Sequence, residues 1–130
     1  MEKIYQIVSK LNFKSFCSEI TQQSESSVIF KLKYSYHDNH VEEILCIQEV
    51  NGAVILSDNG STFSNLDDIF ELKEPDTRKN IIAVLKHFNI QPDDGNMFTC
   101  RIDLSKDMIP QILRFLQGIH FLYAMKLFYI

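Results

Sequence analysis

The sequence predicts a single α+β domain over residues 1–130, with an N-terminal helix, a three-stranded antiparallel meander, two helices, a fourth strand and a long C-terminal helix. Two apolar runs, residues 44–50 and 53–57, flank Asn51-Gly52, the dipeptide that best tolerates the positive φ angles of a tight hairpin turn. Apolar residues recur at helical spacing near both ends of the chain. A chain of 130 residues with 45% apolar content suits one domain with a substantial core. We expect the helices to lie mainly on one face of the sheet.

Composition and charge limit the classes of function. The formal net charge is −4, from 13 basic and 17 acidic residues, which gives no electrostatic reason to expect general nucleic-acid binding. Cys17, Cys46 and Cys100 are widely spaced and form no C-x-x-C motif, so we expect free thiols in a reducing cytoplasm. The N-terminus lacks the uninterrupted apolar segment and the small-residue cleavage site of a signal peptide. We therefore expect an acidic, cytoplasmic protein.

The first third of the chain predicts a helix, a connector and a strand. Residues 1–17 place their apolar side chains on one helical face, residues 21–27 form a polar connector, and residues 28–36 alternate as a half-buried strand does. His37 and His40 flank a polar turn without a second pair of ligands nearby, so we predict neither a metal site nor another cofactor. The apolar positions are Ile4, Ile7, Val8 and Leu11 in the helix and Val28, Phe30, Leu32, Tyr34 and Tyr36 in the strand.

The turn at Asn51-Gly52 fixes the register of the predicted hairpin. Both faces of this hairpin are largely apolar, which predicts strands that are covered on both sides, at least near their base. The opposed pairs are Val50 with Ala53, Gln48 with Ile55, and Cys46 with Ser57.

A polar corner, Ser57-Asp58-Asn59-Gly60, ends the hairpin and precedes a helix predicted over residues 61–70. Asp and Asn side chains bond to nearby backbone, and Gly accepts unusual φ angles. One interpretation is structural, with Asp58 accepting backbone N–H bonds at a strand-to-helix corner. The other is functional, with the corner forming a polar binding site that presents Asp58 to a ligand or a partner. The sequence leaves both open.

An acidic stretch follows this corner. Such a run is usually a solvated face, and the alternative is a docking surface for a basic partner. The stretch contains Asp67, Asp68, Glu71, Glu74 and Asp76. Together with the corner, the candidate binding residues are Ser57, Asp58, Asn59, Gly60, Asp67, Asp68 and Glu71.

The following segment predicts a helix, a turn and a strand. Asp76 or Thr77 caps the helix, which runs through about Phe88. Residues 92–95 form a turn, and residues 97–104 alternate as a fourth strand.

The final helix is capped by Ser105 or Asp107 and carries a broad apolar stripe. Residues 119–130 are apolar almost all round, but interruptions such as Arg114 and Lys126 argue against a membrane span, and we expect no membrane partner. A buried core helix explains the stripe, and a homodimer or partner surface is the alternative. The stripe consists of Ile109, Ile112, Leu113, Leu116, Ile119, Leu122 and Tyr123.

Residues 55–62, Ile-Leu-Ser-Asp-Asn-Gly-Ser-Thr, with Leu66 after them, resemble the L-S-D-x-G-x-T signature of a bacterial and phage domain family of unknown function, number 1828 in that series. A charged helix containing Arg78 and an I-L-x-x-F-x-I-like segment over residues 84–90 fit the same family, so the resemblance covers roughly residues 25–125. The family brings no established activity and implies no catalytic residue. Its occurrence in bacteria and mobile elements implies a small cytoplasmic accessory protein.

Motifs of familiar enzyme classes are missing from the sequence, which has no G-x-S-x-G, no Walker loop and no H-E-x-x-H. One enzymatic alternative carries a specific chemistry. Asp58, Glu71 and Lys73 match the D…E-x-K pattern of metal-dependent nucleases, in which two carboxylates hold Mg²⁺ and a lysine lies beside the attacking water. In such nucleases the E-x-K triplet normally lies on a strand, whereas here it falls at the end of a predicted helix.

The leading hypothesis is a non-enzymatic module that binds a protein partner. Small size, the lack of catalytic motifs, the acidic stretch and the apolar final helix motivate it. One concrete version is a mobile-element inhibitor or regulator of a host nucleic-acid system, whose acidic side chains occupy a basic channel by charge complementarity. Direct DNA binding ranks third, because it requires Lys31, Lys33 and neighbouring basic residues to form a stripe.

Overall fold

The computed structural model describes residues 4–11, 17–32, 44–58, 74–92 and 97–125, which contain three α-helices and six strands. The helices are α1 (Ile4–Ser9), α3 (Pro75–His87) and α4 (Met108–Ala124). The strands are β1 (Cys17–Ser24), β2 (Ser27–Leu32), β3 (Ile44–Val50), β4 (Ala53–Ser57), β5 (Gln91–Pro92) and β6 (Phe98–Ile102).

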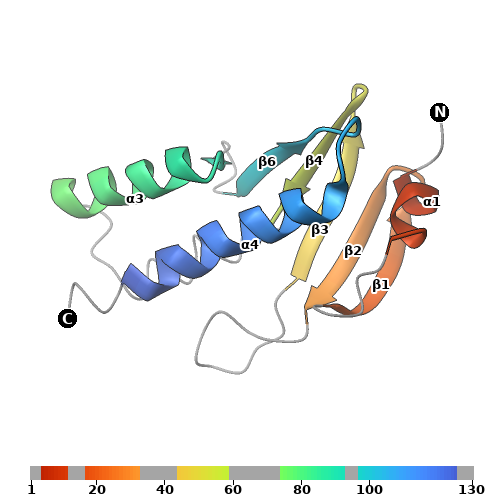
Figure 1. The fold of residues 1–130 in the computed structure, drawn as a ribbon, viewed down its shortest axis with the longest axis horizontal. Helices are drawn as coiled ribbons and strands as arrows, with labels where there is room; N and C mark the ends of the chain where they lie inside the picture. The colour runs from red at the N-terminus through yellow and green to blue at the C-terminus, as the bar shows by residue number, and fades with distance from the viewer. Residues whose placement is uncertain (1–3, 12–16, 33–43, 59–73, 93–96, 126–130) are drawn as a thin grey trace.

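The six strands form one antiparallel sheet in the order β1-β2-β3-β4-β6-β5 (Figure 1). Helices α1 and α4 lie over the same face of this sheet, and α3 lies beside α4 rather than over the strands (Figure 1). The predicted α+β class is confirmed. The prediction of four strands is wrong, because β1 and β5 add one strand at each edge.

The N-terminal part differs most from the prediction. The helix predicted over residues 1–17 ends at Ser9, and Cys17 begins β1. Residues 21–24, predicted to be a connector, continue β1, which pairs with β2. Strand β1 exposes most of its side chains on both faces, so it lacks the alternation of apolar and polar residues that marks a strand in sequence.

The central hairpin of β3 and β4 has the predicted register along its whole length. Val50 pairs with Ala53, and the ladder continues as predicted through Cys46 and Ser57. Asn51 has a φ of 52° and Gly52 a φ of 81°, the left-handed values that a type I′ turn requires. The local sequence therefore determines this turn.

One face of the sheet carries the core, whereas the hairpin was predicted to be covered on both sides. On the opposite face Cys46, Ile55 and Ser57 are half-buried, and Gln48 and Arg101 are exposed. The second face is therefore covered only in part. The buried apolar strand residues are Cys17, Val28, Phe30, Leu32, Leu45, Ile47, Val54, Leu56, Phe98, Cys100 and Ile102.

Helices α1 and α4 complete the core over that face. Most of the predicted stripe of α4 is buried, but Leu113 is 40% exposed and Ile109 is half-buried. Phe115, which the sequence analysis did not assign to the stripe, is 1% exposed. The buried apolar residues of α1 and α4 are Ile4, Val8, Met108, Ile112, Phe115, Leu116, Ile119, Leu122 and Tyr123, and α3 adds Ile81 and Leu85.

The ends of α3 follow recognisable capping rules. The predicted caps Asp76 and Thr77 are wrong: Glu74 is the N-cap, and its carboxylate accepts hydrogen bonds from Asp76 N at 3.2 Å and Thr77 N at 2.8 Å. The helix ends at His87 with Phe88 as its C-cap, one residue from the predicted end at about Phe88. Asn89 then adopts a φ of 58° and closes a Schellman motif, in which Ile90 N donates to the carbonyl of Leu85 at 2.8 Å.

The segment around β6 also needs one correction. The strand predicted over residues 97–104 spans Phe98–Ile102, and Leu104 is 42% exposed in the turn that leads to α4. Asp107 caps α4, as one of the two predicted candidates. Pro92 of the predicted 92–95 turn belongs to β5. The predicted helix over residues 61–70 and the turn at residues 37–40 lie outside the described residues.

Candidate functional site

Asp58, the central residue of the predicted corner, is fastened to β6. Its side chain is 1% exposed, and its Oδ1 accepts a hydrogen bond from Phe98 N at 3.1 Å. Its own backbone N–H donates to the carbonyl of Phe98 at 3.2 Å. This pair continues the β4–β6 ladder one step beyond Ser57 and Thr99. It is the kind of backbone bond that the structural interpretation of the corner requires, and the binding interpretation stays a prediction.

The remaining predicted site residues are only partly placed. Ser57 is half-buried and is paired with Cys46 and Thr99 in the sheet. Six predicted residues lie outside the described part of the chain. The structure therefore does not test whether the acidic residues lie together, or whether Asp58, Glu71 and Lys73 do. The six residues are Asn59, Gly60, Asp67, Asp68, Glu71 and Lys73.

Glu74, at the end of the acidic stretch, is engaged within the chain as the cap of α3. Hydrogen bonds from the backbone of Thr77 and Asp76 lower the pKa of this carboxyl, and the Thr77 hydroxyl, which donates to Glu74 Oε2 at 3.0 Å, lowers it further. Glu74 therefore stabilises the start of a helix rather than presenting a free carboxylate.

Two kinds of reactive site, a metal cluster and an activated thiol, can be assessed in the described residues. Among them, no three His, Cys, Asp or Glu side chains gather closely enough to hold a metal ion. Burial raises the pKa of the Cys100 thiol to about 12 and also raises the pKa of Cys46. Both thiols are therefore protonated near neutral pH, and neither has the thiolate character of a nucleophile.

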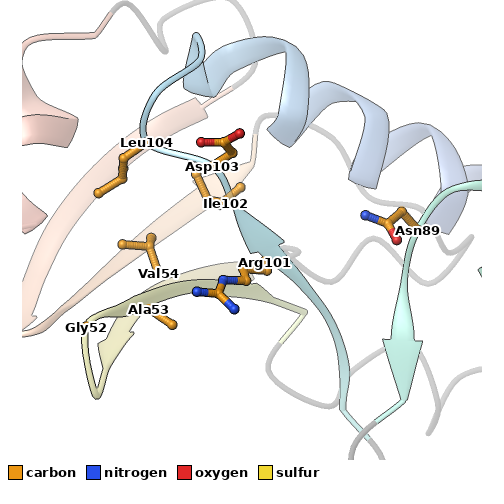
Figure 2. A pocket seen from close by; sticks show the side chains of 8 residues that line it. All are labelled: Gly52, Ala53, Val54, Asn89, Arg101, Ile102, Asp103 and Leu104. Carbon is orange, nitrogen blue, oxygen red and sulfur yellow. The ribbon is translucent and has the colours of Figure 1, made fainter.

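An open hollow of about 520 Å³ lies between the tip of the hairpin and the segment after β6 (Figure 2). Its polar lining is Asn89, Arg101 and Asp103. Hydrogen bonds from Ser105 lower the pKa of Asp103, and the charges of Lys106 and Arg101 lower it further. Positive and negative groups thus balance at this hollow, and it has no net charge that would select an ionic ligand.

The chain that leaves α3 passes unusually close to α4. A Cβ atom placed on Gly118 of α4 would lie 2.6 Å from Ile90 Cδ1 and 2.8 Å from Phe88 Cβ, so only glycine fits without a shift of the neighbouring atoms. One turn away, Arg114 Nη2 donates to the carbonyl of His87 at 2.9 Å. A cation there also suits the partial negative charge at the C-terminal end of α3.

An aromatic cluster covers the same junction. The His87 ring meets Phe88 edge-on, with centroids 4.9 Å apart, and Phe88 lies 6.1 Å from Phe121. Phe121 is 51% exposed, whereas Phe88 is half-buried. We call His87, Phe88, Arg114, Gly118 and Phe121 the α3–α4 seam. It presents an aromatic side chain to solvent on a well-packed base.

Sequence reasoning did not find the seam. Arg114 was noted only as an interruption of the apolar stripe, and Phe121 lies in a stretch that is apolar almost all round. The available signal was their spacing, because Arg114, Gly118 and Phe121 are four and three residues apart and share one face of a helix. That signal does not reveal which segment packs against the face.

The fold and the seam define a small α+β protein in which α1 and α4 cover one face of an antiparallel sheet. The chain belongs to the family described as Domain of unknown function DUF1828, which matches residues 33–121, more than half of the 130 residues. The match runs from the segment before β3 to Phe121 in α4, and so contains both the Asp58 corner and the α3–α4 seam.

Two further comparisons add no relative. A search of curated proteins found no significant match, and a search of solved structures found none either. Within the described ranges, no helix has the length and apolar character needed to cross a membrane.

Proposed function

We propose that this chain is a non-enzymatic protein-interaction module, and that it binds its partner through the α3–α4 seam. The observation that carries the proposal is the half-exposed ring of Phe121, held against Phe88 at a junction that Arg114 and Gly118 fix in place. Aromatic and arginine side chains are the residue types most enriched in the energetically dominant centres of protein interfaces.

A preordered aromatic anchor favours binding for a thermodynamic reason. Phe121 lies on a regular helix, and its ring already packs against Phe88, so little side-chain entropy remains to be lost when a partner covers it. Of the five large apolar side chains that are most exposed in the described residues, three lie on α3 and α4. These three are Ile82, Leu113 and Phe121.

Charges near the seam indicate the kind of partner. Lys86, next to His87 in the last turn of α3, is exposed, and Arg114 of α4 donates to the carbonyl of His87, although the whole chain has a net charge of −4. A partner surface with an apolar pocket and an acidic rim complements this arrangement. The narrower version of the proposal is a mobile-element inhibitor of a host nucleic-acid system. That version depends instead on Asp67, Asp68 and Glu71, which are a second candidate binding surface to be tested.

The experiment is a comparison of two baits followed by a binding measurement. The wild-type chain and a Phe121→Ala variant are used to purify partners from a lysate of the source organism, and the recovered partner is then titrated against each. We expect the dissociation constant to rise about 30-fold or more in the variant, the effect of losing about 2 kcal/mol at an interface centre.

Leu104→Ala is the matched control, because Leu104 is 42% exposed and lies in the turn before α4, outside the residues of the seam. We expect this variant to bind as the wild type does. Unchanged affinity in both Phe121→Ala and Arg114→Ala, with circular dichroism showing both folded, would contradict the seam as the binding surface.

A further inference from the structure

The two edges of the sheet are built differently. Strand β5 forms one edge with two residues, Gln91 and Pro92, and proline offers no backbone N–H to a neighbouring strand. Strand β1 forms the other edge with eight residues, Cys17–Ser24. It contains no proline and no lysine, and Glu19 is its one charged residue. Proline and lysine, two residues that usually block strand pairing, are thus absent from β1, although its pairing with β2 shifts register between Cys17 and Glu19 and between Gln22 and Ser24. The regular stretch between the two shifts is centred on Ile20 and Thr21.

The outer side of β1 is open to solvent. From Ser18 to Ser24 every side chain except that of Ile20, which is half-buried, is exposed. In the part of the chain that the structure describes, the backbone ladder of β1 runs only to β2. Among the described residues, no other strand meets the outer side of residues 18–24, so this edge can accept one.

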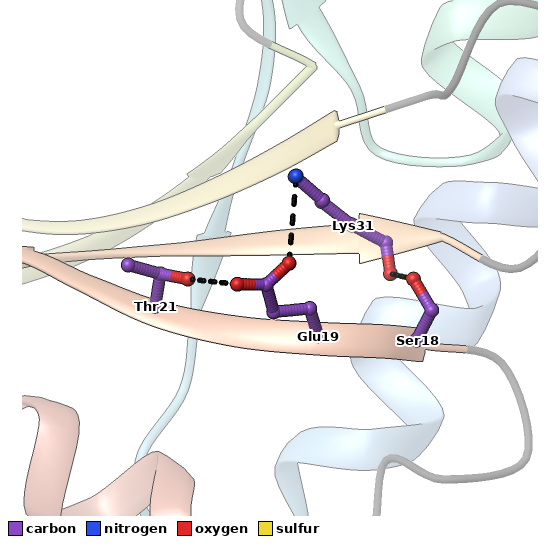
Figure 3. A network of polar contacts seen from close by, with 4 residues as sticks. All are labelled: Ser18, Glu19, Thr21 and Lys31. Carbon is purple, nitrogen blue, oxygen red and sulfur yellow. Dashed lines mark hydrogen bonds and ion pairs between the residues drawn. The ribbon is translucent and has the colours of Figure 1, made fainter.

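The single charge of β1 is turned back over its own sheet. Glu19 Oε2 lies 3.4 Å from Lys31 Nζ of β2, and Glu19 Oε1 accepts a hydrogen bond from Thr21 Oγ1 at 3.3 Å (Figure 3). Ser18 Oγ adds a bond to the carbonyl of Lys31 at 3.4 Å (Figure 3). Lys31 partly offsets the one negative charge that would repel an approaching strand.

We propose that β1 pairs antiparallel with β1 of a second copy of this chain, so that the two sheets become continuous across a two-fold axis. A second copy fits because the strand complements itself when the axis passes through Thr21. Threonine then faces threonine, a favourable cross-strand pair, and Glu19 faces the partner's Gln23 rather than another carboxylate. Moving the axis to Gln22 would place Glu19 opposite the partner's Glu25, and like charges would oppose each other.

This pairing stops at two copies, because both β1 edges are then used and the two edges that remain are the β5 strands, which pair poorly. A strand pair of this length buries little surface, so we expect a dimer that forms with rising concentration rather than a permanent one. The inference does not depend on the α3–α4 seam, which lies on other elements of the fold.

Sedimentation velocity over a range of concentrations tests the proposal. We expect the wild-type mass to move from 15.2 kDa toward twice that value as concentration rises. Thr21→Lys places two like charges opposite each other at the axis and is expected to keep the chain monomeric. Thr21→Val keeps a β-branched side chain and is expected to dimerise. Both substitutions are at an exposed position, and circular dichroism confirms that each variant is folded.

Cross-linking tests the register. Opposed Cα atoms in antiparallel strands lie about 4.5–5.5 Å apart, within the range that a disulfide spans. Mild oxidation is expected to link Thr21→Cys into a covalent dimer, whereas the wild type and Gln91→Cys, an exposed position at the other edge, stay unlinked. A wild type that is monomeric at every concentration overturns the proposal. So does a dimer that persists in Thr21→Lys, which would place self-association on another surface such as the final helix.

Discussion

Asp58 and Phe98, which are 40 positions apart in the sequence, hold each other by two hydrogen bonds at the end of the β4–β6 ladder. The carboxylate of Asp58 accepts from Phe98 N at 3.1 Å, and Asp58 N donates to the carbonyl of Phe98 at 3.2 Å. The Asp58 side chain thus takes part in the pairing of β4 with β6, one residue beyond the end of β4. This relationship gives the Ser-Asp corner a structural task, whatever else it does.

Replacing Asp58 with alanine is expected to lower the free energy of unfolding by about 1–3 kcal/mol. The change leaves the buried N–H of Phe98 without its acceptor, and an unsatisfied buried donor costs about that much. Asp58→Asn keeps an acceptor oxygen and is expected to lose less. Urea unfolding followed by circular dichroism measures both. Equal stability of wild type and Asp58→Ala would show that the carboxylate is dispensable for folding and would favour the binding interpretation.

Gly118→Ala is expected to destabilise the protein by about 1–3 kcal/mol through overpacking. Its new Cβ would meet Ile90 Cδ1 at 2.6 Å and Phe88 Cβ at 2.8 Å, and the better helix propensity of alanine offsets only about 1 kcal/mol of that. Combining it with Ile90→Val removes the Cδ1 atom and is expected to restore part of the loss. Thermal unfolding of the wild type, Gly118→Ala and the double variant measures both effects, and a stabilised Gly118→Ala would contradict the close contact.

Acid is expected to weaken the start of α3. The folded-state pKa of Glu74 is lowered from its ordinary 4.5, so its contribution to stability is present above pH 4.5 and is lost as pH falls through the lower, folded-state value. Glu74→Gln should therefore reduce stability at pH 7 and reduce it less at pH 3. The melting temperatures of both proteins at the two pH values give the result. The same penalty at both would rule out the charge of Glu74 as its cause.

Cys100 is expected to resist alkylation in the folded protein. Burial raises its pKa to about 12, so almost no thiolate exists at pH 8, and its side chain is 9% exposed. Iodoacetamide labelling at pH 8, read by mass spectrometry, should leave Cys100 unmodified until urea is added. Rapid labelling of Cys100 without denaturant would mean that the core over β6 opens readily.

The nuclease alternative predicts a different result from the interaction module. We expect DNA incubated with the protein and Mg²⁺ to stay intact when its length is followed on a gel. Metal-dependent cleavage that disappears in Lys73→Ala would replace the interaction module with an enzyme that uses Asp58, Glu71 and Lys73. Lys73→Ala is the informative variant, because the loss of the Asp58 carboxylate also affects folding.

The parts of the fold that the sequence predicts are those that local chemistry determines. Asn51-Gly52 sets both the turn and the register of the hairpin, because few other residues tolerate two successive positive φ angles. Strand β1 escapes prediction, because an edge strand exposed on both faces has no apolar period. Glu74 escapes it as a cap, because glutamate is not among the residue types preferred there.

The α3–α4 seam shows why sites of this kind are hard to find. Its geometry depends on Gly118 meeting a segment about thirty residues earlier, and only the folded chain brings the two together. In the candidate set, the sequence identified Asp58 as unusual and offered the backbone bond as one of two explanations. The sequence could not distinguish the two explanations. The donor to the Asp58 carboxylate is the N–H of Phe98, which belongs to a strand 40 positions further along the chain.

The position of β2 has a practical consequence for expression work. The family match begins at residue 33, whereas β2, which ends at Leu32, supplies the outer neighbour of β3 and contributes Val28 and Phe30 to the core. A clone trimmed to the match would start inside the sheet, bare the apolar strand β3 along its whole length and invite aggregation. The cooperative folding unit of this protein is therefore larger than the segment by which its family is recognised.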